Sequence, residues 1–241
     1  MDKLNVNTIE PEGGTTTINV GKAGKNVIIT DNLKANTLKD AGGNTIFTSN
    51  GSAVLSSVNS GFGSAQVLLS TQTASNSASI EFTSGIDGTY KEYLFEFINI
   101  NAVSNGAKLY VSFSSDGGSS YGITKTTTAF RARHDESDST ASLAYSSGDD
   151  LAQSTSSQIL SGTGVSSASD ECSVGELHLF NPASTTYVKN FYNTQQTSEG
   201  GYSYQMFVAG YLNTTSAITA VKFDLNTGNI NSGKIKMYGI K

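Results

Sequence analysis

The sequence predicts an all-β protein in which a repetitive N-terminal β-shaft precedes an antiparallel, jelly-roll-like β-sandwich. Two patterns predict this class. A period of nine residues runs from Ile18 to Ser60, and roughly ten short segments of alternating apolar and polar residues follow it. No segment has the apolar spacing of about 3.6 residues that marks an amphipathic helix. We expect a β-helix-like or β-prism-like shaft over residues 15–63 and a sandwich head over residues 64–241.

The composition agrees with a chain of many strands and polar turns. Charged residues make up 15% of the chain, against about 25% in average globular proteins. The 11 Tyr and 11 Phe argue against disorder, which is typical of chains with few aromatic residues. The net charge is −5 and the basic residues are not clustered, so we expect no nucleic-acid partner. The single Cys172 excludes an intramolecular disulfide framework and fits assembly in a reducing cytosol.

The first segment, residues 1–14, is short and polar, and it contains the turn-forming residues Pro11, Gly13 and Gly14. Met1–Thr8 has no basic region followed by an apolar core, so we expect no signal peptide. No run in the chain approaches the roughly 20 apolar residues that span a bilayer, so we expect no membrane insertion. Two interpretations of residues 1–14 stay open: a docking arm for another component of a particle, or a frayed terminus.

The repeat places one apolar residue in each nine-residue unit. These residues, here called the seam, are Val20, Ile29, Leu38 and Phe47. Each unit holds too few large apolar residues to enclose a core by itself, so its apolar stripe must be buried against neighbouring units or other chains. We therefore expect an intertwined homotrimer whose copies share the seam. An irregular run of small hairpins is the alternative interpretation.

Alternating segments predict the strands of the head. They are Val67–Thr71, Ala78–Thr83, Tyr93–Asn101, Lys108–Ser114, Tyr121–Phe130, Gln158–Leu160, Cys172–Phe180, Tyr187–Tyr192, Tyr202–Leu212, Ile218–Leu225 and Lys234–Ile240. Tyr93–Asn101 is apolar on both sides, which predicts a central strand. Asp116-Gly117-Gly118 is expected to close a hairpin after Lys108–Ser114. The Thr-rich segment Tyr121–Phe130 is expected at a sheet edge.

Six phenylalanines in alternating segments are expected to fill the core, because burying one stabilises the fold by about 1.5–3 kcal/mol. They are Phe95, Phe97, Phe113, Phe180, Phe207 and Phe223. Arg131–Ser157 is the least regular stretch, rich in Ser and Asp, and predicts a long surface loop. Loops of this length in compact domains are usually functional or mobile.

No motif for catalysis or metal binding stands out. His134 and His178 have ordinary interpretations as a loop residue and a strand residue. The carboxylate pairs Asp135-Glu136, Asp149-Asp150 and Asp170-Glu171 lie in polar loops, and neighbouring residues rarely converge on one ion or bond. We therefore expect a protein that is not an enzyme and that has no cofactor and no metal.

Binding is the function that the residue types favour. Tyrosine offers a rigid amphipathic face at low entropic cost, and sugar rings stack on such faces. The candidate ligand-binding residues are Tyr121, Arg131, Arg133, His134, Tyr145, Tyr192 and Tyr202, with Phe130–Leu151 as the expected recognition loop. In the alternative interpretation the tyrosines cap the core or line a subunit interface.

Three segments resemble fibre or tail-associated virion proteins of bacteriophages, especially marine and cyanobacterial phages. They are TLKDAGGNTIFTSNGSAVLSSVNSGF (37–62), TQTASNSASIEFTSGIDGTYKEYLFEFINI (71–100) and the closing SGKIKMYGIK (232–241). The resemblance implies a homotrimeric virion component, assembled in the host cytoplasm, that binds other virion proteins through its N-terminus. It also implies that the head binds a glycan or receptor on the host surface, and it transfers no catalytic residue.

Two other functions stay open at this stage. A capsid decoration or head-fibre protein would have the same layout, with the N-terminal arm gripping the shell. A glycan depolymerase is the enzymatic alternative, although such enzymes usually present their carboxylate pair on a far longer β-helix. The sequence does not separate a tail position from a capsid position.

Overall fold

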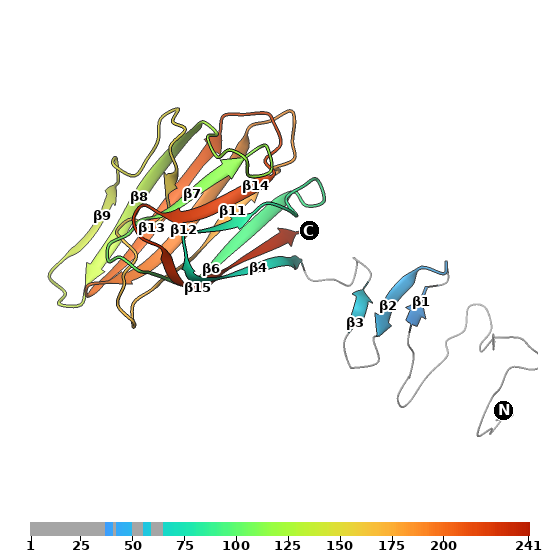
Figure 1. Cartoon of the computed structure of the whole chain (residues 1–241), viewed down its shortest axis with the longest axis horizontal. Coiled ribbons are helices and arrows are strands. Elements are labelled where there is room, and N and C mark those ends of the chain that lie inside the picture. The colour runs from blue at the N-terminus through green and yellow to red at the C-terminus, as the bar shows by residue number, and fades with distance from the viewer. Residues whose placement is uncertain (1–36, 41, 50–54, 59–64) are drawn as a thin grey trace, which may run out of the picture. The chain divides into compact units, whose positions relative to one another are not determined.

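The computed structural model describes residues 37–40, 42–49, 55–58 and 65–241, and all regular structure in them is β-strand (Figure 1). The chain divides into two units, Met1–Gly63 and Ser64–Lys241. The expected docking arm, residues 1–14, and the seam residues Val20 and Ile29 lie outside the described residues. The predicted all-β class is confirmed, whereas the shaft and the trimer stay predictions.

The described part of the first unit is a small antiparallel meander of three strands, β1 (Thr37–Lys39), β2 (Thr45–Ser49) and β3 (Leu55–Val58). Leu38 pairs directly with Phe47 across β1 and β2, and both side chains are only partly buried. Gly43, at a φ of 83°, turns the chain between these two strands. The nine-residue period therefore places two seam residues side by side, because one unit equals one strand plus one turn.

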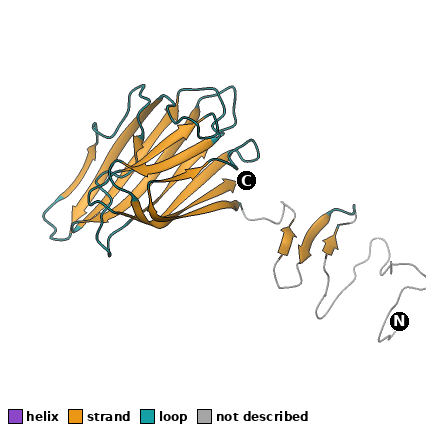
Figure 2. Ribbon diagram, viewed as in Figure 1, coloured by secondary structure: helices purple, strands orange, loops and turns teal. Residues whose placement is uncertain are grey.

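The second unit is a sandwich of two antiparallel sheets, and Figure 2 shows that it consists of strands and connecting loops. The large sheet has the strand order β4-β15-β6-β11-β12-β13-β8-β9, and the small sheet has the order β10-β7-β14-β5. The strands of the large sheet are β4 (Gln66–Ser77), β6 (Glu92–Ala102), β8 (Lys125–Asp135), β9 (Ala141–Tyr145), β11 (Ser173–Phe180), β12 (Lys189–Glu199), β13 (Tyr202–Leu212) and β15 (Ile230–Ile240). Those of the small sheet are β5 (Ser79–Phe82), β7 (Leu109–Ser114), β10 (Gln158–Ile159) and β14 (Ala220–Leu225).

The chain returns to the large sheet after every strand of the small sheet. The predicted hairpin after Lys108–Ser114 is therefore wrong, since β7 and β8 belong to different sheets. Asp116 instead shapes a crossing turn: its carboxylate accepts hydrogen bonds from the hydroxyls of Ser114 and Ser120 at 2.6 Å each. These bonds lower the pKa of Asp116 to about 2. Local turn residues fix such a bend but not the sheet that the next strand joins.

The expected long loop over Arg131–Ser157 is also wrong in its first half. β8 continues to Asp135, and β9 pairs with it and forms the edge of the large sheet, so Tyr121–Phe130 does not supply the edge strand (Figure 1). The Asp135 carboxylate accepts backbone N–H bonds from Ser139 and Thr140 at 2.9 and 2.7 Å. Those bonds close the β8–β9 hairpin. Hydrogen bonds from the Ser137 and Ser139 hydroxyls, together with these backbone bonds, hold the pKa of Asp135 well below its usual range.

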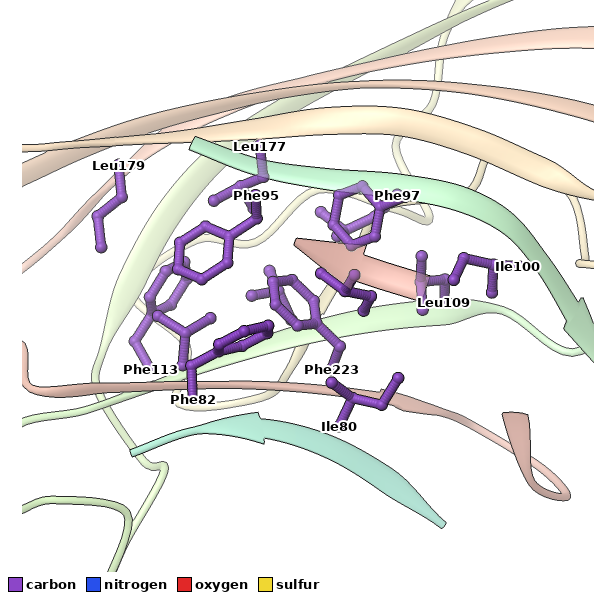
Figure 3. Close-up of a cluster of buried hydrophobic side chains, with 14 of the residues drawn as sticks. Ile80, Phe82, Phe95, Phe97, Ile100, Leu109, Phe113, Leu177, Leu179 and Phe223 are labelled. Carbon is purple, nitrogen blue, oxygen red and sulfur yellow. The ribbon is translucent and has the colours of Figure 1, made fainter. Parts of the chain in front are cut away.

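The apolar half of the interior is aromatic. Phe223 of β14 lies in edge-to-face contact with Phe82, Phe95 and Phe97, at centroid distances of 6.3, 5.4 and 5.0 Å (Figure 3). This arrangement suits the ring quadrupoles and adds about 0.5–1.5 kcal/mol per pair beyond area burial. Core positions are confirmed for Phe95, Phe97, Phe113 and Phe223.

Phe180 and Phe207 do not belong to this core, so their expected role is wrong. Both are partly buried residues on the opposite face of the large sheet. Leu177 and Leu179 take the inward positions beside Phe180, and Met206 and Val208 take those beside Phe207. Alternation over a strand defines two faces, but it identifies the buried face only when one face is polar.

The interior between β8, β12 and the 146–166 segment is polar. Gln158 accepts a hydrogen bond from the Thr127 hydroxyl at 2.6 Å and donates to the Asp149 carbonyl at 2.7 Å. The buried Lys125 ammonium donates to the Ser156 carbonyl at 2.7 Å. Burial lowers the pKa of Lys125 to about 8. The sandwich therefore has an aromatic end and a hydrogen-bonded end.

Candidate ligand-binding face

The outer face of the large sheet, which points away from the small sheet, carries the candidate site. Register places one row across it through His178, Tyr192, Ala209 and Thr128, from β11 to β8. The neighbouring row on one side runs through Phe180, Asn190, Tyr211 and Thr126, and the row on the other side runs through Glu176, Thr194, Phe207, Phe130 and Tyr145. Aromatic side chains therefore lie beside small or polar ones on this face, and the last of these rows crosses five adjacent strands.

Several large apolar side chains on this face are exposed. Phe130 is 42% exposed, Leu143 72%, Tyr145 56% and Tyr192 38%. Phe130 of β8 stacks on Phe207 of β13 with a centroid distance of 4.8 Å and an interplanar angle of 13°. Large aromatic side chains are usually buried, and an exposed cluster of them on a sheet face often marks a binding surface.

A groove of about 410 Å³ lies beside Tyr192 on this face and is here called the Tyr192 groove. Ala209 and Gly210 leave room at its floor between larger neighbours on β12 and β8. Its lining residues are Thr126, Thr127, Thr128, Phe180, Asn190, Phe191, Tyr192, Ala209, Gly210 and Tyr211. The groove therefore combines exposed ring faces with hydroxyl and amide groups, and no lining residue is charged.

The imidazole ring of His178 packs against the ring of Tyr192. The two rings stack with centroids 4.5 Å apart and planes 19° apart. Nδ1 of His178 donates to the Glu92 carboxylate at 2.5 Å, and Nε2 lies 3.6 Å from the Glu176 carboxylate. Partial burial raises the pKa of the Tyr192 phenol, and the negative charges of Glu176 and Glu92 raise it further. The phenol therefore stays a hydrogen-bond donor at neutral pH.

A second hollow of about 410 Å³ lies farther along β12 and β13 and is here called the Gln205 hollow. Its lining residues are Glu96, Phe97, Ile98, Val174, Gly175, Glu176, Thr194, Gln196 and Gln205. The Glu96 carboxylate already has partners, Lys236 at 3.4 Å and the Tyr238 hydroxyl at 3.2 Å. Glu176 has only the His178 ring nitrogen near it among the ion pairs of the described residues.

The structure brings three of the predicted ligand-binding residues to the outer face: Tyr192, Tyr145 and His134. Tyr145 lies at the β9 edge and donates its hydroxyl to Asp150 at 2.5 Å. His134 lies on β8, where Nε2 is 3.0 Å from the Asp138 carboxylate. Only Tyr192 of these three lines the Tyr192 groove.

The other four predicted residues do not project from the outer face, although Tyr202 and Arg133 each line a small hollow together with His134. Tyr121 is next to the small sheet, where its hydroxyl donates to Glu81 at 3.0 Å and Lys222 lies 5.0 Å from its ring centroid. Arg131, Arg133 and Tyr202 alternate with the outward-facing residues of their strands. Arg131 donates to the Gly162 carbonyl at 3.0 Å, and Arg133 donates to the Ser142 hydroxyl at 3.1 Å.

Sequence reasoning missed Phe180, Tyr211 and the amides of Asn190 and Gln205, which line the two hollows. The available signal was the second phase of alternation in Tyr187–Tyr192 and Tyr202–Leu212. In that phase every second residue is aromatic, small or amide-bearing, and none is Lys or Arg. A solvated sheet face usually carries charged residues at some of these positions. The lack of Lys and Arg in this phase is therefore the sequence signal for an unusual face.

Within the described residues, no group of three His, Cys, Asp or Glu side chains is placed to hold a metal ion. The part of the chain that the structure describes also contains no helix long and apolar enough to cross a membrane. In the carboxylate pair Asp149-Asp150, Asp149 accepts a hydrogen bond from the Lys108 ammonium at 2.6 Å, and Asp150 accepts one from the Tyr145 hydroxyl at 2.5 Å. This pair is therefore engaged in structural contacts.

Comparison of the chain with protein-family models, with curated proteins and with solved structures finds no match. The candidate function therefore depends on the geometry of the outer face and on the resemblance of the three segments described above.

Proposed function

We propose that this chain is a non-enzymatic fibre protein of a bacteriophage virion, whose jelly-roll-like head attaches the particle to a host-surface glycan. The observation that carries the proposal is the Tyr192 groove. Its exposed rings offer an apolar platform for the C–H face of a sugar, while Thr126, Thr128 and Asn190 offer partners for hydroxyl groups. A groove open along a sheet suits a ligand that is itself part of a larger surface.

The first unit gives separate support to the oligomeric part of the proposal. Leu38 and Phe47 are direct cross-strand neighbours, yet neither is fully buried within the described residues. In the proposed homotrimer, the other two copies cover this apolar stripe along the whole seam. The docking arm, residues 1–14, then binds other virion proteins, and the trimer assembles in the host cytoplasm before the particle is released.

Attachment is tested with the full-length protein and Tyr192→Ala, on whole host cells and on polysaccharide extracted from their surface. Removing the ring should weaken binding by about tenfold to a hundredfold, because ring platforms dominate such contacts. Tyr187→Ala is the matched control, since Tyr187 is 69% exposed and does not line the groove. Equal binding by both variants, or no binding by the wild-type protein, would contradict the proposal.

The trimer is tested by Phe47→Asp in the full-length chain. A carboxylate in a shared apolar stripe costs several kcal/mol, so the variant should lose mass in light scattering and melt at a lower temperature. Thr37→Asp on the neighbouring strand β1 is the control, because Thr37 is exposed and alternates with the seam residue Leu38. A wild-type protein that is monomeric would overturn the trimer.

The position in the particle is tested by imaging virions labelled with an antibody against the head. Label at the tail is the expected result. Label over the shell would instead establish the capsid decoration function, for which the same docking arm would grip the capsid. A reducing-sugar assay on the extracted polysaccharide checks the enzymatic alternative, and robust release of sugar ends would overturn the non-enzymatic part of the proposal.

A further inference from the structure

The two hollows on the outer face lie in line along β12. Asn190 and Tyr192 line the Tyr192 groove, and Thr194 and Gln196 line the Gln205 hollow. All four side chains point outward, because they alternate with the buried residues of the strand. From Asn190 to Gln196 the strand extends about 20 Å, which is longer than one monosaccharide. Tyr192 lines the Tyr192 groove and is the outward-facing neighbour of Thr194, which lines the Gln205 hollow.

The strands that carry both hollows have no Lys or Arg side chain on this face, while at the margin of the Gln205 hollow Glu96 of β6 is paired with Lys236 of β15 at 3.4 Å. The outward-facing residues of the described strands β8, β9, β11, β12 and β13 include no Lys and no Arg. Glu176 is the carboxylate among them, and its side chain is 48% exposed at the Gln205 hollow. Burial raises the pKa of the Tyr192 phenol, and the nearby carboxylates of Glu176 and Glu92 raise it further.

We propose that the ligand is an uncharged or amino-bearing saccharide chain that spans both hollows, and that Glu176 excludes acidic sugars from the second one. This inference rests on the proposed function and names the chemical class of its ligand. The ring of Tyr192 supports the middle of the chain. The amides of Gln196 and Gln205 bond its hydroxyl groups, and an ammonium group at the second hollow gains from Glu176.

The class of ligand is tested by binding the full-length protein to an array of neutral, amino-bearing and uronate-bearing oligosaccharides of increasing length. Neutral or amino-bearing glycans should bind, and affinity should rise with length until both hollows are occupied. A preference for uronate-bearing glycans would overturn the inference while leaving attachment intact. Binding that is complete with a monosaccharide would overturn the two-hollow arrangement. The lack of any binding on the array would count against the proposed function itself.

Glu176→Gln isolates the electrostatic part. The variant keeps the size of the side chain, so neutral ligands should bind as before, while uronate-bearing ligands should gain roughly fivefold. Glu81→Gln is the matched control, because Glu81 is an exposed carboxylate on β5 of the small sheet. In the wild-type protein, 1 M salt should weaken the exclusion, since the Debye length falls to about 3 Å. If uronate-bearing ligands were still excluded both in Glu176→Gln and in 1 M salt, the exclusion would be steric, and the proposed role of Glu176 would be overturned.

Gln205→Ala isolates the second hollow. Long oligosaccharides should lose several-fold in affinity, whereas a short one that fills only the Tyr192 groove should bind unchanged. Melting temperature reports whether the fold is intact, and Gln72→Ala is the control, because Gln72 is an exposed glutamine on β4 that lines neither hollow. An equal loss for short and long ligands would place the whole ligand in one hollow and contradict the inference.

Discussion

The two faces of the large sheet carry similar residues in opposite environments. On the inner face Phe95 and Phe97 are fully enclosed by the small sheet, and Phe223 packs edge-to-face against both. On the outer face Phe130 and Phe207 stack nearly parallel, and Phe130 is 42% exposed. The difference teaches that aromatic content alone does not assign a residue to the core. A second layer covers one face, whereas rings on the other face stay partly exposed.

The largest expected effect lies on the inner face. Phe223→Ala removes the ring that contacts Phe82, Phe95 and Phe97, and it should lower the free energy of unfolding by about 3–5 kcal/mol. Chemical denaturation of the full-length protein, followed through the transition of the second unit, measures the loss. A cost below about 1 kcal/mol would mean that the aromatic end of the interior is loosely packed, and would remove the contrast between the faces.

The polar end of the interior predicts an intermediate, pH-dependent effect. Burial lowers the pKa of Lys125 to about 8, against 10.5 for an accessible lysine. The unfolded chain therefore binds more protons than the folded one between these values, so stability should rise with pH, by about 2 kcal/mol from pH 7.5 to 10. The series stops at pH 10, because the raised tyrosine pKa values act in the opposite direction above it.

The variant Lys125→Met tests whether this one residue causes the rise of stability with pH. The variant should be at least as stable as the wild-type protein at pH 7.5, since no buried ammonium remains, and its stability should change less with pH. Lys222→Met is the control, because Lys222 lies on β14 beside Asp224 and is only partly buried. An unchanged slope in Lys125→Met would show that the buried lysine does not set the pH dependence.

The smallest effect on stability is expected on the outer face. Phe130→Ala removes a ring that packs on Phe207 alone among the aromatic pairs of the described residues, and it should cost about 1 kcal/mol or less. The same denaturation experiment measures it beside Phe223→Ala. A cost as large as that of Phe223→Ala would indicate that the outer cluster is a second core, covered in solution, rather than an exposed binding face.

Part of the candidate site followed from the sequence. Tyr192 was among the predicted ligand-binding residues, and alternation located nearly every strand that positions the two hollows. Phe180 and Phe207 are predicted core residues because they lie in alternating segments, and alternation alone does not tell which of the two faces is covered. Tyr121 was grouped with Tyr192, although Tyr121 contacts residues of β5 and β14 in the small sheet. Nearness of two residues across a sandwich depends on strand order, and no local pattern encodes that order.

The sequence by itself determined the all-β class, most strand positions and the residue types available for binding, because backbone pleating and turn chemistry act over a few neighbouring residues. Only the tertiary structure decided which face of each strand is covered, that Asp116 turns the chain into the other sheet, and that Tyr192, Tyr211 and Phe180 share one groove. These features arise from pairings between strands far apart in the chain, whose registry is selected by packing of the whole sandwich.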